Sequence, residues 1–229
     1  MLILHQDEAL LVVHKPSGLL VHRGLGADCD TVLARLARIV HGPLFSVHRL
    51  DRGTSGVLVL TRTREAARRL SSSWSTGQCH KHYFALVRGQ PPPSARVDHP
   101  IPADEAGPRV DARTSIETLA TVGVSGSPLR ETRYSLVRAA PETGRFHQVR
   151  RHLKHLGHPV LGDANYGRRE HNQLCAERFG LRRLALHALS VVLPHPLSGK
   201  RVRIVAPMPD DLSAPLGAMG FVLDPAWQA

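Results

Sequence analysis

The segment from His48 to Gly56, HRLDRGTSG, places the carboxylate of Asp51 between two arginines. Arg49 and Arg52 favour the ionised carboxylate, which can act as a nucleophile or as a base. Small, turn-forming residues follow, and then the apolar run VLVL, so Asp51 is expected in a loop that leads into a buried strand. Local chemistry alone favours another interpretation, in which Asp51 forms a structural ion pair with a neighbouring arginine.

A second segment, TGRFHQVRRH at 143–152, is basic or imidazole at five of its ten positions. The pattern predicts a turn that becomes a helix, with Arg150 and Lys154 four residues apart on one face. That face can bind a phosphate or a buried carboxylate. A solvated basic helix face is an equally good interpretation of the segment on its own.

The elements that must position these residues can be predicted from periodicity. Residues 2–22 indicate a strand that ends in the turn KPSG, and residues 184–206 indicate two strands joined by the turn HPLSGK. Further strands are predicted at 57–61, 83–87 and 132–139, and helices at 30–41, 64–76 and 144–156. The stretch from about 90 to 130 is rich in Pro, Gly, Ser and Thr and predicts loops with one or two short strands. Strands and helices do not alternate regularly, so we expect an α+β fold on a mixed, largely antiparallel sheet.

Composition limits the classes of function. The 229 residues include 30 Lys and Arg against 19 Asp and Glu, a net charge of +11, which makes the chain a candidate nucleic-acid binder. A GC-rich genome, which favours Arg codons, together with ordinary solvated charge explains the same composition equally well. No apolar run is long enough to span a membrane and no secretory signal is evident, so we expect a cytoplasmic protein.

Several kinds of site are not indicated. The three cysteines, at 29, 79 and 175, are odd in number and widely spaced, which argues against a disulfide framework and against a Cys-rich zinc site. The 15 histidines lack the spacing of metal ligands, so we expect no metal. The phosphate-binding, dinucleotide-binding and hydrolase motifs are also missing, and we expect no nucleotide cofactor.

Five segments together resemble one family. HRLDRGTSG is similar to the signature of the RluA branch of the pseudouridine synthases. In the family's order, the chain also carries HKPSGLLVH at 14–22, KHYFALVRG at 81–89, TGRFHQVRRHLKHLGHPVLGDANYG at 143–167 and LHALSVVLPHPLSGK at 186–200. The resemblance implies the pseudouridine synthase fold, with a mixed, largely antiparallel central sheet flanked by helices and loops. It also implies a single catalytic domain over 1–229, with no S4-like RNA-binding module and a variable loop region at 90–130.

The resemblance implies that the protein isomerises a specific uridine of structured RNA to pseudouridine, with base flipping and no cofactor. The likeness is greatest to members that modify uridine 65 of tRNA, and an rRNA site or another tRNA site is the alternative. We expect RNA as the partner and a monomer in solution. The charge alone leaves open a non-catalytic RNA-binding protein.

The family's residue roles carry over to matching positions. Asp51 matches the catalytic aspartate, Tyr83 the tyrosine that stacks on the target base, and Arg150 the basic residue that pairs with the aspartate. Arg49 matches a residue that enters the helix stack when the base leaves. The other positions expected to bind substrate are His48, Lys81, Arg145, His147 and Gln148.

Overall fold

The computed structural model describes residues 1–23, 29–104, 107–126, 129 and 132–228. The chain divides into two compact units. Unit 1 contains Met1–His80 and Ala188–Ala206, and unit 2 contains Lys81–His187 and Pro207–Ala229. The assignment of 1–229 to one catalytic domain stays a prediction.

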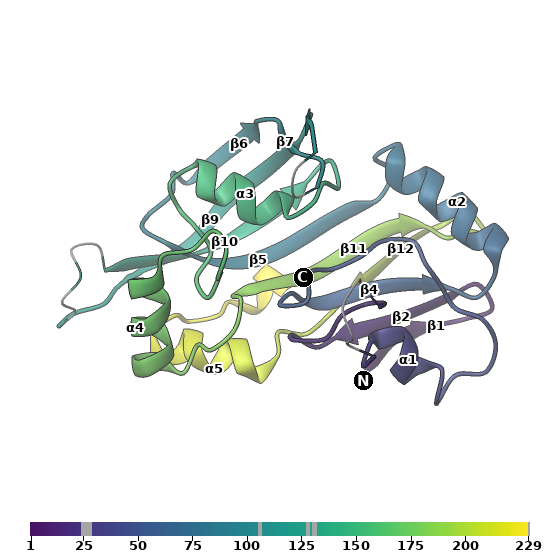
Figure 1. The fold of residues 1–229 in the computed structure, drawn as a ribbon, viewed down its shortest axis with the longest axis horizontal. Coiled ribbons are helices and arrows are strands. Elements are labelled where there is room, and N and C mark those ends of the chain that lie inside the picture. The colour runs from purple at the N-terminus through teal and green to yellow at the C-terminus, as the bar shows by residue number, and fades with distance from the viewer. Residues whose placement is uncertain (24–28, 105–106, 127–128, 130–131, 229) are drawn as a thin grey trace. The chain divides into compact units, whose positions relative to one another are not determined.

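The helices and strands follow one another along the chain as Figure 1 shows. In chain order they are β1 (Ile3–Gln6), β2 (Leu10–Lys15), α1 (Val32–Leu36), β3 (Phe45–Ser46), β4 (Ser55–Thr61), α2 (Arg64–Ser75), β5 (His80–Arg88), β6 (Ser94–Asp98), β7 (Ile101–Pro102), β8 (Arg109–Val110), β9 (Arg113–Gly123), β10 (Arg133–Pro141), α3 (Gln148–His155), α4 (Arg169–Phe179), β11 (Leu186–Pro194), β12 (Arg201–Val205), α5 (Asp210–Ala218) and the 3₁₀ turn η1 (Pro225–Gln228).

The sheet of unit 1 has the strand order β1-β2-β4-β11, with β12 beside β11 and β3 beside β4. The pairs β1–β2, β2–β4, β3–β4 and β11–β12 are antiparallel. All seven residues of β4 are buried, because apolar side chains cover both of its faces. One face packs with α2 in a core made of Ala9, Leu10, Val12, Val57, Val59, Ala66, Leu70, Cys79, Val191, Leu193, Ile204 and Ala206.

Helix α2 begins as its sequence predicts. The Thr63 hydroxyl accepts a hydrogen bond from the amide of Ala66 at 3.1 Å, and Glu65 stands in the first turn, where its charge complements the helix dipole. Ala66 and Leu70 point into the core, and burial of a leucine of this kind stabilises the fold by about 1.5–3 kcal/mol.

Gly56 is required where β4 approaches β11. Its φ is +117°, and a Cβ at this position would lie 2.1 Å from the carbonyl oxygen of Ala188. No larger residue fits against that backbone. The glycine at the end of HRLDRGTSG therefore sets how closely β4 and β11 pack, directly after the loop that holds Asp51.

The sheet of unit 2 has the strand order β5-β10-β9-β6, and its neighbouring strands are antiparallel. Strands β7 and β8 form a separate two-stranded ribbon. Helix α3 packs on β9 and β10, and α4 packs on α5 (Figure 1). Val149 and Leu153 are buried, and they form the inward face of α3.

Three sequence predictions need correction. The described residues between 90 and 130 form four strands, and one of them, β9, is 11 residues long. This strand was missed because only Thr114 and Ile116 are buried, and the residues from Thr118 to Val122 are all half-buried and show no alternation. The first 22 residues form two strands, and the helix predicted at 30–41 covers only Val32–Leu36, with Thr31 rather than Asp30 as its cap.

The fold class agrees with the sequence. The strand pairs whose register is described are antiparallel, and a few helices cover the sheets, so the predicted α+β fold is confirmed. Across the described residues, every helix is too short or too polar to traverse a lipid bilayer.

Candidate active site

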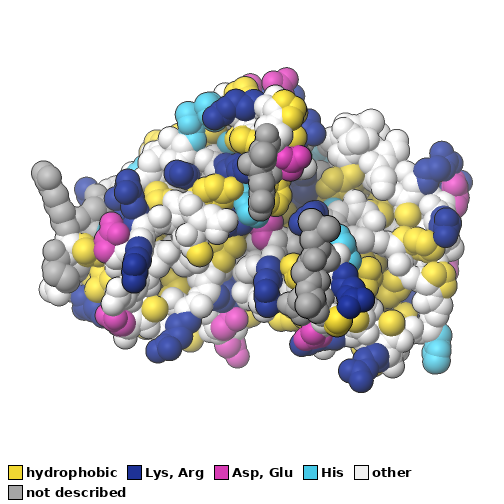
Figure 2. All heavy atoms as spheres, in the orientation of Figure 1, with side chains coloured by type: hydrophobic (Ala, Val, Ile, Leu, Met, Phe, Trp, Pro, Cys, Tyr) yellow, Lys and Arg dark blue, Asp and Glu magenta, His cyan; other side chains and the backbone are white. Residues whose placement is uncertain are grey.

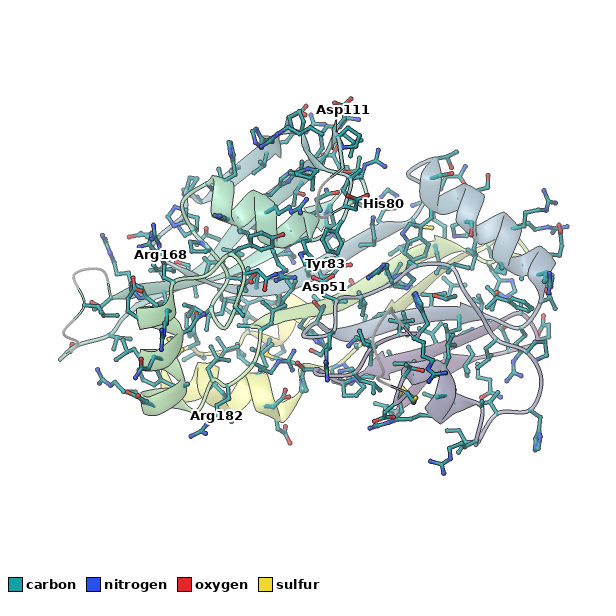
Figure 3. The ribbon with its side chains drawn as sticks, in the orientation of Figure 1. Asp51, His80, Tyr83, Asp111, Arg168 and Arg182 are labelled. Atoms are coloured by element: carbon teal, nitrogen blue, oxygen red, sulfur yellow. The ribbon has the colours of Figure 1, made fainter. Side chains whose placement is uncertain are left out.

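Asp51 lies in the loop between β3 and β4 of unit 1, and its side chain is half-buried (Figure 3). Its carbonyl oxygen accepts a hydrogen bond from the amide of Thr54 at 3.0 Å, which closes a tight turn. Thr54 and the strand that follows are buried. The carboxylate thus projects from a short loop that a rigid strand holds in place.

Four hydrogen bonds tie this loop to the turn after β2. The amide of Gly18 donates to the Arg52 carbonyl at 2.8 Å, and Arg52 Nε donates back to the Gly18 carbonyl at 2.9 Å. Ser17 Oγ donates to the Gly53 carbonyl at 2.7 Å, and Lys15 Nζ to the Arg52 carbonyl at 3.1 Å. The KPSG turn therefore positions the loop that carries the candidate nucleophile.

The ammonium group of Lys15 is the central donor of this arrangement. Lys15 is fully buried, and its Nζ also donates to the carbonyl oxygens of Pro16 at 2.9 Å and Leu19 at 2.7 Å. A buried ammonium is stable only when its donors are satisfied, and three carbonyls meet that need. The KPSG motif is visible in the sequence, but the role of Lys15 becomes visible only in the structure.

His48 is held by the protein on two sides. Its Nε2 accepts a hydrogen bond from the amide of Val59 at 2.9 Å, so the proton of the neutral ring lies on Nδ1. The ring also stacks on Trp74, with centroids 4.5 Å apart and planes 15° from parallel. These contacts fix the start of the Asp51 loop against β4 and α2.

Arg49 differs from its neighbours because it is exposed. Within the described part of the chain it has no hydrogen bond or ion pair. Its guanidinium is therefore available to an external group.

Lys81 and Tyr83 belong to β5 of unit 2. Lys81 is buried and its Nζ donates to the carbonyl of Thr143 at 3.1 Å. Tyr83 is half-buried and pairs with Ala139 of β10, so the sheet backbone sets the position of its ring (Figure 3).

Arg150, on α3, forms a buried ion pair with Asp163. Nε donates to Oδ2 at 2.7 Å and Nη2 donates to Oδ1 at 2.8 Å, a bidentate contact along one edge of the guanidinium. The two side chains are 8% and 0% exposed. Burial raises the pKa of the Asp163 carboxyl, but the hydrogen bonds and charge of Arg150 and two backbone amides outweigh it, and the pKa is lowered.

The loop around Asp163 is itself fixed. Oδ1 accepts from the amides of Asn165 at 3.0 Å and Tyr166 at 3.1 Å, and the Asp163 carbonyl accepts from Nδ2 of Asn172 at 3.0 Å. A Cβ on Gly167 would lie 2.3 Å from that carbonyl oxygen, so this position requires glycine. The segment GDANYG thus forms a rigid support for Arg150.

Gln148 holds the turn that precedes α3. Its side-chain oxygen accepts from Thr143 Oγ1 at 2.7 Å and from the amide of Arg145 at 3.0 Å. Its Nε2 donates to the carbonyl of Arg113 at 2.7 Å and to Thr114 Oγ1 at 3.0 Å. The amide group thus uses its full hydrogen-bonding capacity within the protein, and Gln148 positions the turn rather than reaching outward.

Two other residues of this turn are more accessible. Arg145 is exposed, and its Nε donates to the carbonyl of Asp111 at 3.2 Å. His147 has a φ of +55°, the only positive value for a non-glycine residue in the described chain. Backbone strain of this kind is tolerated where the surrounding structure fixes it, and it is frequent at functional sites.

Tyr166 connects the basic side chains of α3. Arg151 Nε donates to its hydroxyl at 2.9 Å, and the hydroxyl lies 3.1 Å from His147 Nδ1. The Arg150 guanidinium and the Lys154 ammonium lie 5.0 Å and 5.6 Å from the ring centroid. Tyr166 was not predicted as a site residue.

The structure therefore groups the predicted residues within each unit. His48 and Arg49 accompany Asp51 in unit 1, and Lys81, Tyr83, Arg145, His147, Gln148 and Arg150 belong to unit 2. Lys15, Asp163 and Tyr166 were missed. Each lies in a segment that the family resemblance includes, but only the hydrogen bonds reveal its role.

The comparisons with known proteins agree with one another. The family described as RNA pseudouridylate synthase matches residues 9–155. The tRNA pseudouridine synthase C of Salmonella typhimurium is 39% identical over 234 residues, which cover 96% of this chain and 90% of that protein. The ribosomal large subunit pseudouridine synthase C of Pasteurella multocida is 39% identical over 228 residues, which cover 95% of this chain and 67% of that protein.

A solved structure extends the similarity to the fold. Human RNA pseudouridylate synthase domain containing 4 has a TM-score of 0.76 and 30% sequence identity, and the match covers 95% of this chain and 92% of that one.

Proposed function

Because the chain belongs to the RNA pseudouridylate synthase family, we propose that this isomerase converts uridine 65 of tRNA to pseudouridine. The observation that carries the choice of tRNA is the 39% identity to a tRNA pseudouridine synthase C across 96% of the chain. A relative named for the large ribosomal subunit is equally identical over slightly fewer residues, so an rRNA uridine is the second candidate.

The reaction sets clear demands on the protein. The bond between N1 and C1′ of uridine breaks, the uracil turns, and a bond forms between C5 and C1′. C5 loses its proton and N1 carries one in the product, so atoms and charge balance with no oxidation and no energy carrier. The target base must first leave its stack, at a cost of about a few kcal/mol.

We assign to Asp51 either nucleophilic attack on C1′ of the ribose or assistance to glycal formation. A carboxylate can bond to C1′ and leave when C5 attacks, or it can take the C2′ proton to give a glycal and return that proton to C2′ when C5 bonds to C1′. The short loop and its bonds to the KPSG turn support this role, because a nucleophile held by rigid structure needs little reorganisation.

We assign stabilisation of the Asp51 carboxylate to Arg150. The bidentate contact of Asp163 with the Nε–Nη2 edge of the guanidinium supports this assignment, because it holds the Arg150 side chain in one orientation. Asp163 then acts as a positioning residue, since it fixes the direction of the Arg150 side chain.

We assign stacking on the uracil to Tyr83, with a part in proton transfer from C5. Arg49, exposed and without an internal partner in the described chain, fills the vacancy left by the flipped base. We place the reaction in the cytoplasm and expect a monomer that acts without a cofactor.

The target is tested by incubating the purified chain with tRNA and rRNA transcripts and mapping pseudouridine at nucleotide resolution. We expect one modified position in tRNA, at uridine 65, and none when that uridine is replaced by cytidine. Modification of rRNA with untouched tRNA would assign the chain to the second candidate. RNA binding with no pseudouridine in either would favour the non-catalytic alternative.

A further inference from the structure

Unit 2 contains a cavity of about 380 Å³ whose lining is basic. The residues that line it are Arg88, Lys154, Gly157, Pro159, Asn165, Tyr166, Gly167 and Arg168. Three of these side chains are cations and none is acidic. Basic side chains occur across the visible surface, with acids between them (Figure 2), so a cavity lined by three cations and no carboxylate differs from that surface.

The three cations lack carboxylate partners. In the described part of the chain, Arg88, Lys154 and Arg168 take part in no ion pair. Arg88 Nη2 donates to the carbonyl of Gly157 at 3.1 Å, which orients the guanidinium, and Lys154 lies over the Tyr166 ring. Concentrated positive charge without an internal counterion favours an anionic ligand.

Helix α4 adds to the positive electrostatic potential of the cavity. Arg168 is its N-cap residue, and no side-chain hydrogen bond caps this end. The first amides of a helix and its dipole favour negative charge at this end. Glu170, in the first turn, does not line the cavity.

The cavity adjoins residues of the proposed catalytic machinery. Tyr166 lines it, and the same ring is contacted by Arg150. A ligand in the cavity is therefore separated from Arg150 by one aromatic side chain within unit 2.

We propose that this cavity binds a backbone phosphodiester of the RNA substrate, through Arg88, Lys154 and Arg168. The volume exceeds that of a phosphate group, so an adjoining ribose also fits. The inference rests on the proposed function, because it assumes an RNA substrate. A phosphate held here fixes the register of the strand without reading its sequence.

The test compares two matched pairs of substitutions. The cavity variant carries Arg168→Gln and Lys154→Gln, and the control carries Arg182→Gln and Lys200→Gln, two exposed cations outside the cavity with the same loss of charge. Arg168 and Arg182 lie beyond opposite ends of α4 (Figure 3). Both variants must keep the wild-type thermal midpoint, which is expected because all four side chains are exposed.

Affinity for the tRNA transcript is measured from about 50 to about 200 mM KCl. Each lost phosphate contact lowers the slope of log affinity against log salt by about 0.7–0.9, or about fivefold to eightfold in affinity at 0.1 M salt. We expect the cavity variant to lose about 1.4–1.8 in slope and roughly 20-fold to 60-fold in affinity, and the control to lose much less. Equal losses in the two variants would overturn the proposal.

Inorganic phosphate at constant ionic strength distinguishes a free anion from RNA. A saturable rise in thermal midpoint that only the cavity variant loses, together with unchanged tRNA affinity, would assign the cavity to small anions and overturn the proposal. Failure of the proposed function looks different: wild type then makes no pseudouridine, while the cavity variant still binds tRNA more weakly than the control.

Discussion

Replacing Asp163 with asparagine removes the charge opposite Arg150 and leaves the shape of the side chain intact. Oδ1 can still accept from the amides of Asn165 and Tyr166, but a donor now faces the guanidinium, which stays protonated at any physiological pH. The pair is almost fully buried. Breaking such a pair by removing one partner destabilises a protein by about 3–5 kcal/mol.

That loss is large beside a typical total stability of about 5–15 kcal/mol, so urea denaturation resolves it easily. The folded-state pKa of Asp163 is lowered, so its contribution is complete above the unfolded pKa of about 3.9 and is lost as pH falls through the folded pKa. We expect the difference between wild type and Asp163→Asn to be constant from neutral pH to about pH 5 and to shrink below about pH 4.

The control for this prediction is Asp30→Asn, which removes an exposed ion pair with Arg35. We expect it to leave the urea midpoint nearly unchanged, because solvent screens that pair. A double variant that also carries Arg150→Gln should be less destabilised than the sum of the single changes. A loss below about 1 kcal/mol in Asp163→Asn, or strict additivity with Arg150→Gln, would refute the structural role of the pair.

Three further predictions concern unit 1 and the thiols. Lys15→Met keeps the buried aliphatic stem but leaves three carbonyls without their donor. We expect the free energy of unfolding, measured by urea denaturation, to fall by roughly 3 kcal/mol, and turnover to fall as well. An unchanged urea midpoint would contradict this. Gly56→Ala forces a Cβ against the backbone of β11, so we expect the soluble yield and the thermal midpoint to fall sharply. The control is Gly126→Ala, which has open space around its Cβ and should lower the thermal midpoint less. In the native protein a thiol reagent should label the exposed Cys29 and spare the buried Cys79 and Cys175. Burial also raises the pKa of the Cys175 thiol to about 11, which keeps it protonated at neutral pH. Rapid labelling of all three thiols would contradict the core packing.

Strong periodicity made much of the fold predictable from the sequence. The continuous apolar run in β4 and the cap at Thr63 are local signals, and the structure has β4 and α2 within two residues of their predicted bounds. Strand β9 was missed because its half-buried Thr118 and Thr121 resemble a loop when no partner strand is known. Helices α4 and α5 were not predicted. Both have weak amphipathic patterns, and α5 contains Pro215.

The candidate site was predictable only in part. Asp51 and Arg150 stand in recognisable motifs, but the partner of Arg150 lies 13 residues further along, and no periodicity links an arginine on a helix to an aspartate in a loop. Lys15 was hidden for a similar reason, because its ammonium binds backbone carbonyls, which carry no sequence signal. His48 and Gln148 also make contacts that position the protein's own loops, and their binding of substrate stays a prediction.

We propose above that Asp51 acts directly on the ribose. The most direct test of this proposal is single-turnover release of tritium from 5-tritiated uridine in tRNA by Asp51→Asn, at enzyme concentrations that saturate the RNA. We predict a loss of about a thousandfold or more, with tRNA affinity and circular dichroism like those of wild type. Release within about tenfold of the wild-type rate would contradict the assignment of Asp51 as the catalytic carboxylate.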